Sequence, residues 1–230
     1  MPHQRKTRTK TIDAAPTRHL RKYRQVRLEV AAEAARIIAT ESQSNFHVAK
    51  RKAAERVGVS QRAALPSNLE VQDALQNYQR LYGGQQHATN LERLRKVAAN
   101  AMRMLQDFSP RLVGPVLDGT AGRHSRVSLH LFCDGPEHLI LYFLELGTPF
   151  SQEQRQIRWH DGNYRIVPVL VIEQSGVKVE LAVFSPIDLR QAPPSPIDGR
   201  PQHRAGLIEL ECLLDPQSAE AGNVFLETQI

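Results

Sequence analysis

The most informative segment of this chain reads Leu117-Asp-Gly-Thr-Ala-Gly-Arg-His-Ser-Arg-Val-Ser-Leu-His-Leu-Phe-Cys-Asp134. Its polar turn joins two apolar runs, residues 112–117 and 127–132. Residues of the second run alternate, so one side of an extended strand is apolar and the other side carries Ser128 and His130. The segment therefore predicts two strands joined by a turn, with polar side chains along one face of the second strand.

The order strand, Gly-Thr, strand resembles the nucleotidyltransferase fold of the DNA polymerase beta superfamily, and the resemblance spans residues 111–190. In that family the second strand carries an Asp-x-Asp pair, but here Arg126 and Ser128 hold those two positions. Two-metal phosphoryl transfer depends on carboxylates that bind Mg²⁺, whereas a guanidinium repels the ion and a neutral hydroxyl is a poor ligand. The resemblance thus implies a nucleotidyltransferase-like fold with a degenerate metal site.

Family members also place a third carboxylate on a later strand, and Glu180 is the candidate for it. In the run 177–184 the odd positions are apolar, so Lys178 and Glu180 share the opposite face. The resemblance makes Glu180, His130 and Ser128 the candidate catalytic residues. The alternatives are a solvated glutamate and a histidine that only hydrogen-bonds a neighbour.

The turn after the first strand is rich in groups that bind anions. Its candidate nucleotide-binding residues are Gly119, Thr120, Arg123, Ser125 and Arg126, and His124 lies among them. A basic loop that is only solvated is the alternative interpretation.

The net charge of +6 is concentrated at the start of the chain. Nine basic residues stand against one acidic residue up to Arg27, or +8, which leaves 21 basic and 23 acidic residues in the remainder. A segment so poor in apolar residues predicts a disordered arm that is attracted to polyanions, although a solubilising tail would look the same. The candidate nucleic-acid contacts are Arg5, Lys6, Arg8, Lys10, Arg21, Lys22, Arg24, Lys50, Arg51 and Lys52.

The hydrophobic period changes near Pro110 from that of helices to that of strands. Helices are predicted over 21–40, 44–57, 69–82, 90–108, 136–146 and 204–214, and strands over 112–117, 127–132, 164–173 and 177–184, with 156–159 as a further candidate. The pattern predicts an α+β fold in which a helical N-terminal half precedes a small mixed sheet with helices. The predicted divisions are a basic arm (1–20), a helical domain (21–108), a nucleotidyltransferase-like α/β domain (109–214) and a C-terminal tail (215–230).

The segment Ala49-Lys-Arg-Lys-Ala-Ala-Glu-Arg-Val-Gly-Val-Ser60 resembles the start of a helix-turn-helix. Pro66 leaves little room for a recognition helix after Ser60, so we favour an exposed basic helix face. Together with Leu65-Pro-Ser-Asn68 and Leu129-His-Leu-Phe132, the first six of these residues also resemble proteobacterial proteins of unassigned role. That resemblance implies no activity.

Composition narrows the class of protein. No run approaches the roughly 18 apolar residues of a membrane helix, and the start lacks the apolar stretch of a secretory signal. Cys133 and Cys212 are too few for a disulfide framework or a cysteine-based zinc site. We therefore expect a cytoplasmic protein without a membrane partner. The sequence contains no phosphate-binding Walker loop, no Gly-x-Gly-x-x-Gly and no His-Glu-x-x-His. It therefore gives no specific support to a kinase, ligase, dehydrogenase or hydrolase function.

The sequence best fits a degenerate nucleotidyltransferase-like protein that binds a nucleotide or RNA, with DNA as a further polyanion, and whose catalysis is unconfirmed. One alternative is an active Mg²⁺-dependent nucleotidyltransferase whose ligand set is rearranged among Asp118, Asp134 and Glu180. Another is a non-enzymatic nucleic-acid-binding or regulatory protein. No cofactor is certain, and Mg²⁺ is the one that catalysis would need.

Overall fold

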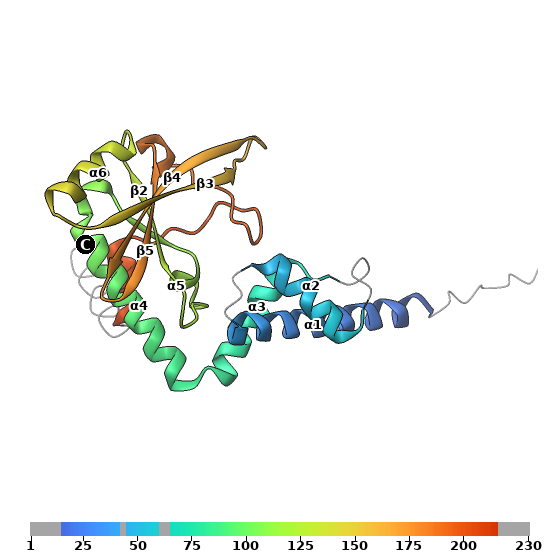
Figure 1. Cartoon of the computed structure of the whole chain (residues 1–230). Coiled ribbons are helices and arrows are strands. Elements are labelled where there is room, and N and C mark those ends of the chain that lie inside the picture. Colours follow the sequence, from blue (N-terminus) through green and yellow to red (C-terminus); the bar gives the residue numbers. More distant parts are fainter. Residues whose placement is uncertain (1–14, 42–44, 60–64, 216–230) are drawn as a thin grey trace, which may run out of the picture.

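The computed structural model describes residues 15–41, 45–59 and 65–215 (Figure 1). Its first three helices are α1 (Ala15–Glu41), α2 (Phe46–Val57) and α3 (Asn68–Tyr82). They pack around one cluster of small apolar side chains, in which Val30 and Ala34 of α1 meet Ala53 of α2 and Val71 of α3. Five of the eight buried residues of this cluster are alanines, so small side chains fill most of this core.

Local chemistry explains where these helices begin and end. The Asn45 side chain accepts hydrogen bonds from the first amides of α2, and Gly58 ends that helix at φ 76°. Ser67 and Glu70 form a reciprocal capping box at the start of α3. α1 already begins at Ala15, inside the segment that we predicted to be a disordered arm, while residues 1–14 lie outside the described chain.

Helix α4 (Gly84–Met104) leads from the three helices to the sheet (Figure 1). Its buried residues, among them Leu94, Val97 and Met102, belong to the same core cluster as the strands. The sequence division at residue 108 therefore separates α4 from the sheet against which it packs. A 3-10 helix, η1 (Gln106–Phe108), follows α4.

The sheet has five strands in the order β1-β2-β5-β4-β3. Their bounds are β1 Arg111–Val113, β2 Val127–Phe132, β3 Phe150–Arg158, β4 Tyr164–Gln174 and β5 Val177–Phe184. Among the described strands only the pair β2–β5 is parallel, and the other three pairs are antiparallel. The expectation of an α+β fold with a mixed sheet is confirmed.

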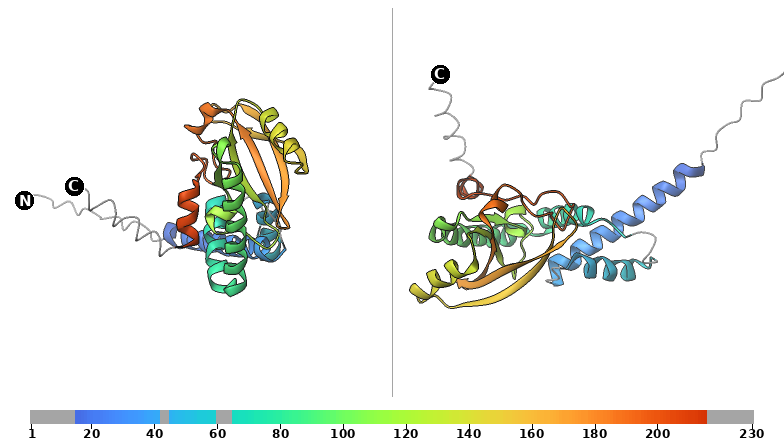
Figure 2. Two further views of the ribbon diagram at one scale, coloured as in Figure 1. Left: turned by 90° about the vertical axis from the view of Figure 1, so that its left-hand side faces the viewer. Right: turned by 90° about the horizontal axis from the view of Figure 1, so that it is seen from above.

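One face of the sheet is covered by helices. The apolar side chains of β2 and β5, such as Leu129 and Leu181, pack with α4, α6 (Pro136–Glu145) and α7 (Leu207–Leu214). Figure 2 shows α4 and α7 running side by side along the sheet. The alternation predicted for both strands is confirmed, because their odd-numbered residues form this buried face.

The opposite face carries a smaller cluster of Phe132, Trp159, Val167, Val169, Val171, Ala182 and Phe184. No residue of a described α-helix belongs to this cluster. The segment after β5 crosses this side, beginning with η2 (Pro186–Leu189), which contacts β2. Polar side chains of the strands are therefore less covered on this face, which we call the open face.

The strand predicted over 112–117 is wrong in its second half. β1 ends at Val113, Gly114 has a φ of 73°, and Pro115 starts the short helix α5 (Pro115–Asp118). Proline lacks an amide hydrogen for a strand and favours the first turn of a helix, so the chain leaves the sheet here. β3 also begins at Phe150, six residues before the predicted strand. The prediction missed these residues because most of them are exposed and show no apolar alternation. No helix of the described ranges is long and apolar enough to cross a membrane.

Candidate anion-binding site

The candidate site is organised around two residues that face each other on neighbouring strands. Ser128 and Glu180 are partners in the parallel register of β2 and β5. Their side chains therefore project from the same face of the sheet, the open face. The Ser128 hydroxyl donates a hydrogen bond of 3.3 Å to Glu180 Oε2.

Two arginines hold the Glu180 carboxylate. Arg126, just before β2, places Nη1 2.8 Å from Oε1, and Arg155, on β3, places Nη2 2.8 Å from Oε2. Burial alone would raise the pKa of Glu180, but the hydrogen bonds and charges of Arg155 and Arg126 outweigh burial and lower the pKa below its ordinary value. Glu180 is therefore an ionised carboxylate whose two oxygens are both engaged.

A cavity of about 350 Å³ opens beside this cluster. Its lining residues, which we call the basic pocket, are Arg93, Arg123, His124, Ser125, Arg126, Gly176, Val177 and Lys178. Within the described part of the chain no acidic side chain lines it, and Arg93, Arg123 and Lys178 form no ion pair. Unpaired cations around a small hollow favour an anionic ligand.

A second hollow of about 230 Å³ shares Arg126 and Lys178 with the basic pocket. Its other lining residues are Pro149, Phe150, Ser151, Glu153, Val171, Ile172 and Glu173. Glu153 also reaches to 3.7 Å from Arg126 Nη1. The two hollows thus adjoin at Arg126 and Lys178, and of the charged side chains the first holds cations alone, whereas the second also holds two carboxylates.

Gly119 and Thr120 lie elsewhere than expected for ligand contacts, since neither lines the basic pocket. The Gly119 carbonyl accepts a hydrogen bond of 3.1 Å from His87, and the Thr120 carbonyl accepts one of 2.9 Å from Gln79. Asn90 donates to the carbonyl of Gly122. These contacts anchor the start of the loop between α5 and β2, residues 119–126, to α3 and α4. The later residues of this loop, Arg123, Ser125 and Arg126, line the pocket.

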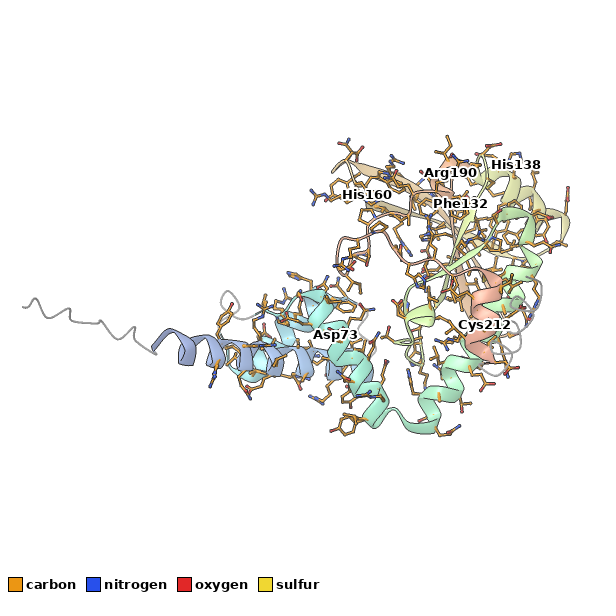
Figure 3. The ribbon with its side chains drawn as sticks, turned by 180° about the vertical axis from the view of Figure 1, so that it is seen from behind. Asp73, Phe132, His138, His160, Arg190 and Cys212 are labelled. Carbon is orange, nitrogen blue, oxygen red and sulfur yellow. The ribbon has the colours of Figure 1, made fainter. Side chains whose placement is uncertain are left out.

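His130 shares the open face with Ser128 but has separate partners. Arg204 donates its Nε hydrogen to His130 Nδ1 over 3.1 Å, and its guanidinium carbon lies 4.9 Å from the ring centre of Phe132, which Figure 3 labels. Burial and the charges of Arg204 and Arg155 lower the pKa of His130 to about 3. His130 is therefore a neutral, buried acceptor for Arg204 at ordinary pH.

The expected nucleic-acid contacts of the helical part divide into two groups. Lys50 donates to Asn68 over 2.7 Å and has a pKa lowered by burial, and Lys52 pairs with Glu41. Arg51, Arg21 and Arg24 are exposed. The remaining candidates, Arg5, Lys6, Arg8, Lys10 and the side chain of Lys22, lie outside the described part of the chain.

The rearranged metal set does not come together in the described ranges. The Asp118 carboxylate accepts a hydrogen bond from Gln72 on α3, and burial raises its pKa. Asp134 is exposed in the turn after β2, and Glu180 is paired with arginines. Among the described residues there is no group of three or more His, Cys, Asp or Glu side chains that could hold a metal ion.

Sequence reasoning missed three cations of this region. The sequence pattern could have indicated Lys178, because it shares one face of β5 with Glu180. Arg93 and Arg155 had none, because α4 and β3 bring them to the site from distant parts of the sequence. Comparison with known protein families, curated proteins and solved structures gives no match to this chain. The geometry of the site therefore has to support any functional proposal.

Proposed function

We propose that this chain is a degenerate nucleotidyltransferase-like protein that binds the phosphates of a nucleotide or RNA in the basic pocket and does not transfer nucleotidyl groups. The observation that carries the proposal is the pocket itself, in which Arg93, Arg123 and Lys178 have no acidic partner among the described residues. Phosphate groups offer the charge and the oxygen acceptors that such a cluster needs.

The size and surroundings of the pocket favour a small phosphate-bearing molecule or a single strand end. A cavity of about 350 Å³ lies within the range of small-molecule sites. The adjoining hollow offers Glu153 and Glu173, whose carboxylates can accept hydrogen bonds from ribose hydroxyls, beside the apolar side chain of Val171. A ligand with phosphates at one end and a sugar at the other would use both hollows.

The same residues argue against phosphoryl transfer. Arg126 and Ser128 hold the positions of the family's Asp-x-Asp pair and are both hydrogen-bonded to Glu180. A two-metal mechanism needs carboxylates that face the ions and bridge them to the phosphates. With arginine at one position and serine at the other, binding without transfer is the function that fits.

Calorimetric titration tests the proposal. ATP, pyrophosphate and a short single-stranded RNA are each titrated into the wild-type chain and into Arg123→Ala with Lys178→Ala. The matched control, Arg158→Ala with Arg190→Ala, removes two exposed cations that line neither hollow. We expect the pocket variant to lose affinity at least about tenfold, the effect of about 1.4 kcal/mol, and the control to lose little.

Three outcomes would contradict the proposal. Absence of binding by all three ligands would remove it. Equal losses in the two double variants would indicate diffuse attraction to positive charge instead of a site. Robust Mg²⁺-dependent nucleotidyl transfer by the wild-type chain would favour the active enzyme.

A further inference from the structure

Arg126 belongs to two arrangements at once. It lines both hollows, and its Nη1 atom is hydrogen-bonded to Glu180 at 2.8 Å and lies 3.7 Å from Glu153. A guanidinium has five donors in a fixed planar fork, so donors directed at a carboxylate are lost to another anion. A phosphate that takes the Nη1 hydrogens of Arg126 therefore competes with Glu180 for them.

Glu180 can lose Arg126 without being left unpaired. Its Oε2 atom keeps Arg155 at 2.8 Å and the Ser128 hydroxyl at 3.3 Å. A buried carboxylate that retains a charged partner and a second donor avoids the large cost of an unpaired buried charge. Arg126, by contrast, has a side chain that is 41% exposed and already lines the basic pocket.

The two arginines also occupy the space where a divalent cation would meet Glu180. Both carboxylate oxygens accept hydrogen bonds from guanidinium groups, and a metal ion bound there would lie close to two positive charges. Charge on a bound phosphate is instead neutralised by the cations of the basic pocket. Such a site has no place for the metal in its recognition of phosphate.

We infer that Glu180 is an internal anion that competes with the phosphate ligand for Arg126, and that the basic pocket binds phosphates without a divalent cation. This inference rests on the proposed function of the pocket. It assigns Glu180 a role opposite to that of a metal ligand, because the carboxylate weakens phosphate binding. The ligand class is a phosphate group with at least two negative charges, such as pyrophosphate or the end of a nucleoside triphosphate.

A charge-removing substitution tests the competition. Pyrophosphate and ATP are titrated calorimetrically, in the presence of EDTA, into the wild-type chain, Glu180→Gln and Glu145→Gln. Glutamine keeps the shape of Glu180 and removes its charge, while Glu145 is exposed on α6 and lines neither hollow. We expect Glu180→Gln to bind about threefold more tightly, the effect of one partly exposed charge pair, and Glu145→Gln to match the wild type. Unchanged or weaker binding by folded Glu180→Gln would overturn the inference.

The wild-type chain alone supplies the second test, which holds even where Glu180→Gln does not fold. ATP is titrated in EDTA and again with excess Mg²⁺. We expect equal or tighter binding in EDTA, because Mg²⁺ lowers the charge of the ligand. Binding that is at least tenfold tighter with Mg²⁺ would overturn the inference.

The two levels of the proposal fail differently. If the wild type binds and Arg123→Ala with Lys178→Ala abolishes binding, while Glu180→Gln brings no gain, only the competition is wrong. If neither ligand binds to the wild type or to Glu180→Gln, the proposed function is wrong and the competition falls with it.

Discussion

Gln79 of α3 donates its side-chain Nε2 hydrogen to the backbone carbonyl of Thr120 over 2.9 Å, in a position where only 7% of Gln79 is exposed. Gln72 and Gln76 bond to Asp118 from the same helix. Residues spaced by four and three lie on one side of a helix, so α3 presents a polar stripe to the segment that leads into the basic pocket. The apolar stripe of α3 meanwhile packs on α1 and α2.

Gln79→Leu should destabilise the chain and weaken the attachment of the loop 119–126, which leads into the basic pocket. The substitution removes the hydrogen bond to the Thr120 carbonyl, and the loss of a typical hydrogen bond costs about 0.5–1.5 kcal/mol. Urea unfolding measures the change in the free energy of unfolding, with Gln76→Leu as the control because Gln76 is exposed and its bond is 3.5 Å long. Equal stability of the two variants would show that the polar stripe does not hold the loop.

His130 should make the fold sensitive to mild acid. Its folded pKa is about 3, against an ordinary value of 6.5, so below pH 6.5 the unfolded chain takes up a proton that the folded chain refuses. The contribution of His130 to the free energy of unfolding is therefore fully present above pH 6.5. It decreases by about 1.4 kcal/mol for each pH unit as the pH falls from 6.5 towards 3.

The measurement compares urea unfolding at several pH values between 7 and 4. His130→Gln removes the titration and keeps an acceptor for Arg204, so we expect a shallower loss of stability than in the wild type. His138→Gln is the control, since His138 is exposed on α6 (Figure 3). Parallel curves for wild type and His130→Gln would mean that His130 is protonated as easily in the folded chain as outside it.

The arm before α1 should contribute to RNA binding through charge alone. A chain that starts at Ala15 lacks Arg5, Lys6, Arg8 and Lys10 but keeps the pairing of Arg27 with Glu70. For single-stranded RNA the slope of log affinity against log salt should flatten by about 0.7 for each phosphate contact that is lost. Fluorescence anisotropy at two salt concentrations measures both quantities. Equal affinities and slopes would reduce the arm to a solubilising tail.

The alternation of apolar and polar residues was sufficient to predict the strands that bury one face. β2 and β5 have the predicted bounds, because burial under α4, α6 and α7 imposes a clear alternation on their residues. Most of β3 was not predicted, because an exposed edge strand needs no such alternation. Helix α4 was predicted as a helix, yet periodicity cannot say whether its apolar stripe packs on other helices or on a sheet.

The site was predictable where its residues are close in sequence. Arg123, Ser125 and Arg126 come from one loop and do line one hollow. Arg155 lies on the far side of β4 from Glu180, and the strand order that brings it there is a tertiary property. Charged residues have no periodic signal of their own, so their pairing follows from the strand order.

Introducing two carboxylates should turn the anion site into a metal site. Arg126→Asp with Ser128→Asp places an Asp-x-Asp pair beside Glu180, because Ser128 is the register partner of Glu180 and Arg126 now contacts it. Three carboxylates on one face offer the hard oxygen ligands that Mg²⁺ and Mn²⁺ prefer. We expect the variant to bind Mn²⁺, measured by the loss of the free-ion signal in electron paramagnetic resonance, and to lose affinity for pyrophosphate in EDTA. Arg126→Asn with Ser128→Asn has the same size without the charges and should bind no Mn²⁺. A folded aspartate variant that binds no more Mn²⁺ than this control would mean that residues 126, 128 and 180 do not have the geometry of a nucleotidyltransferase metal site, and the resemblance to that family would lose its support at the site.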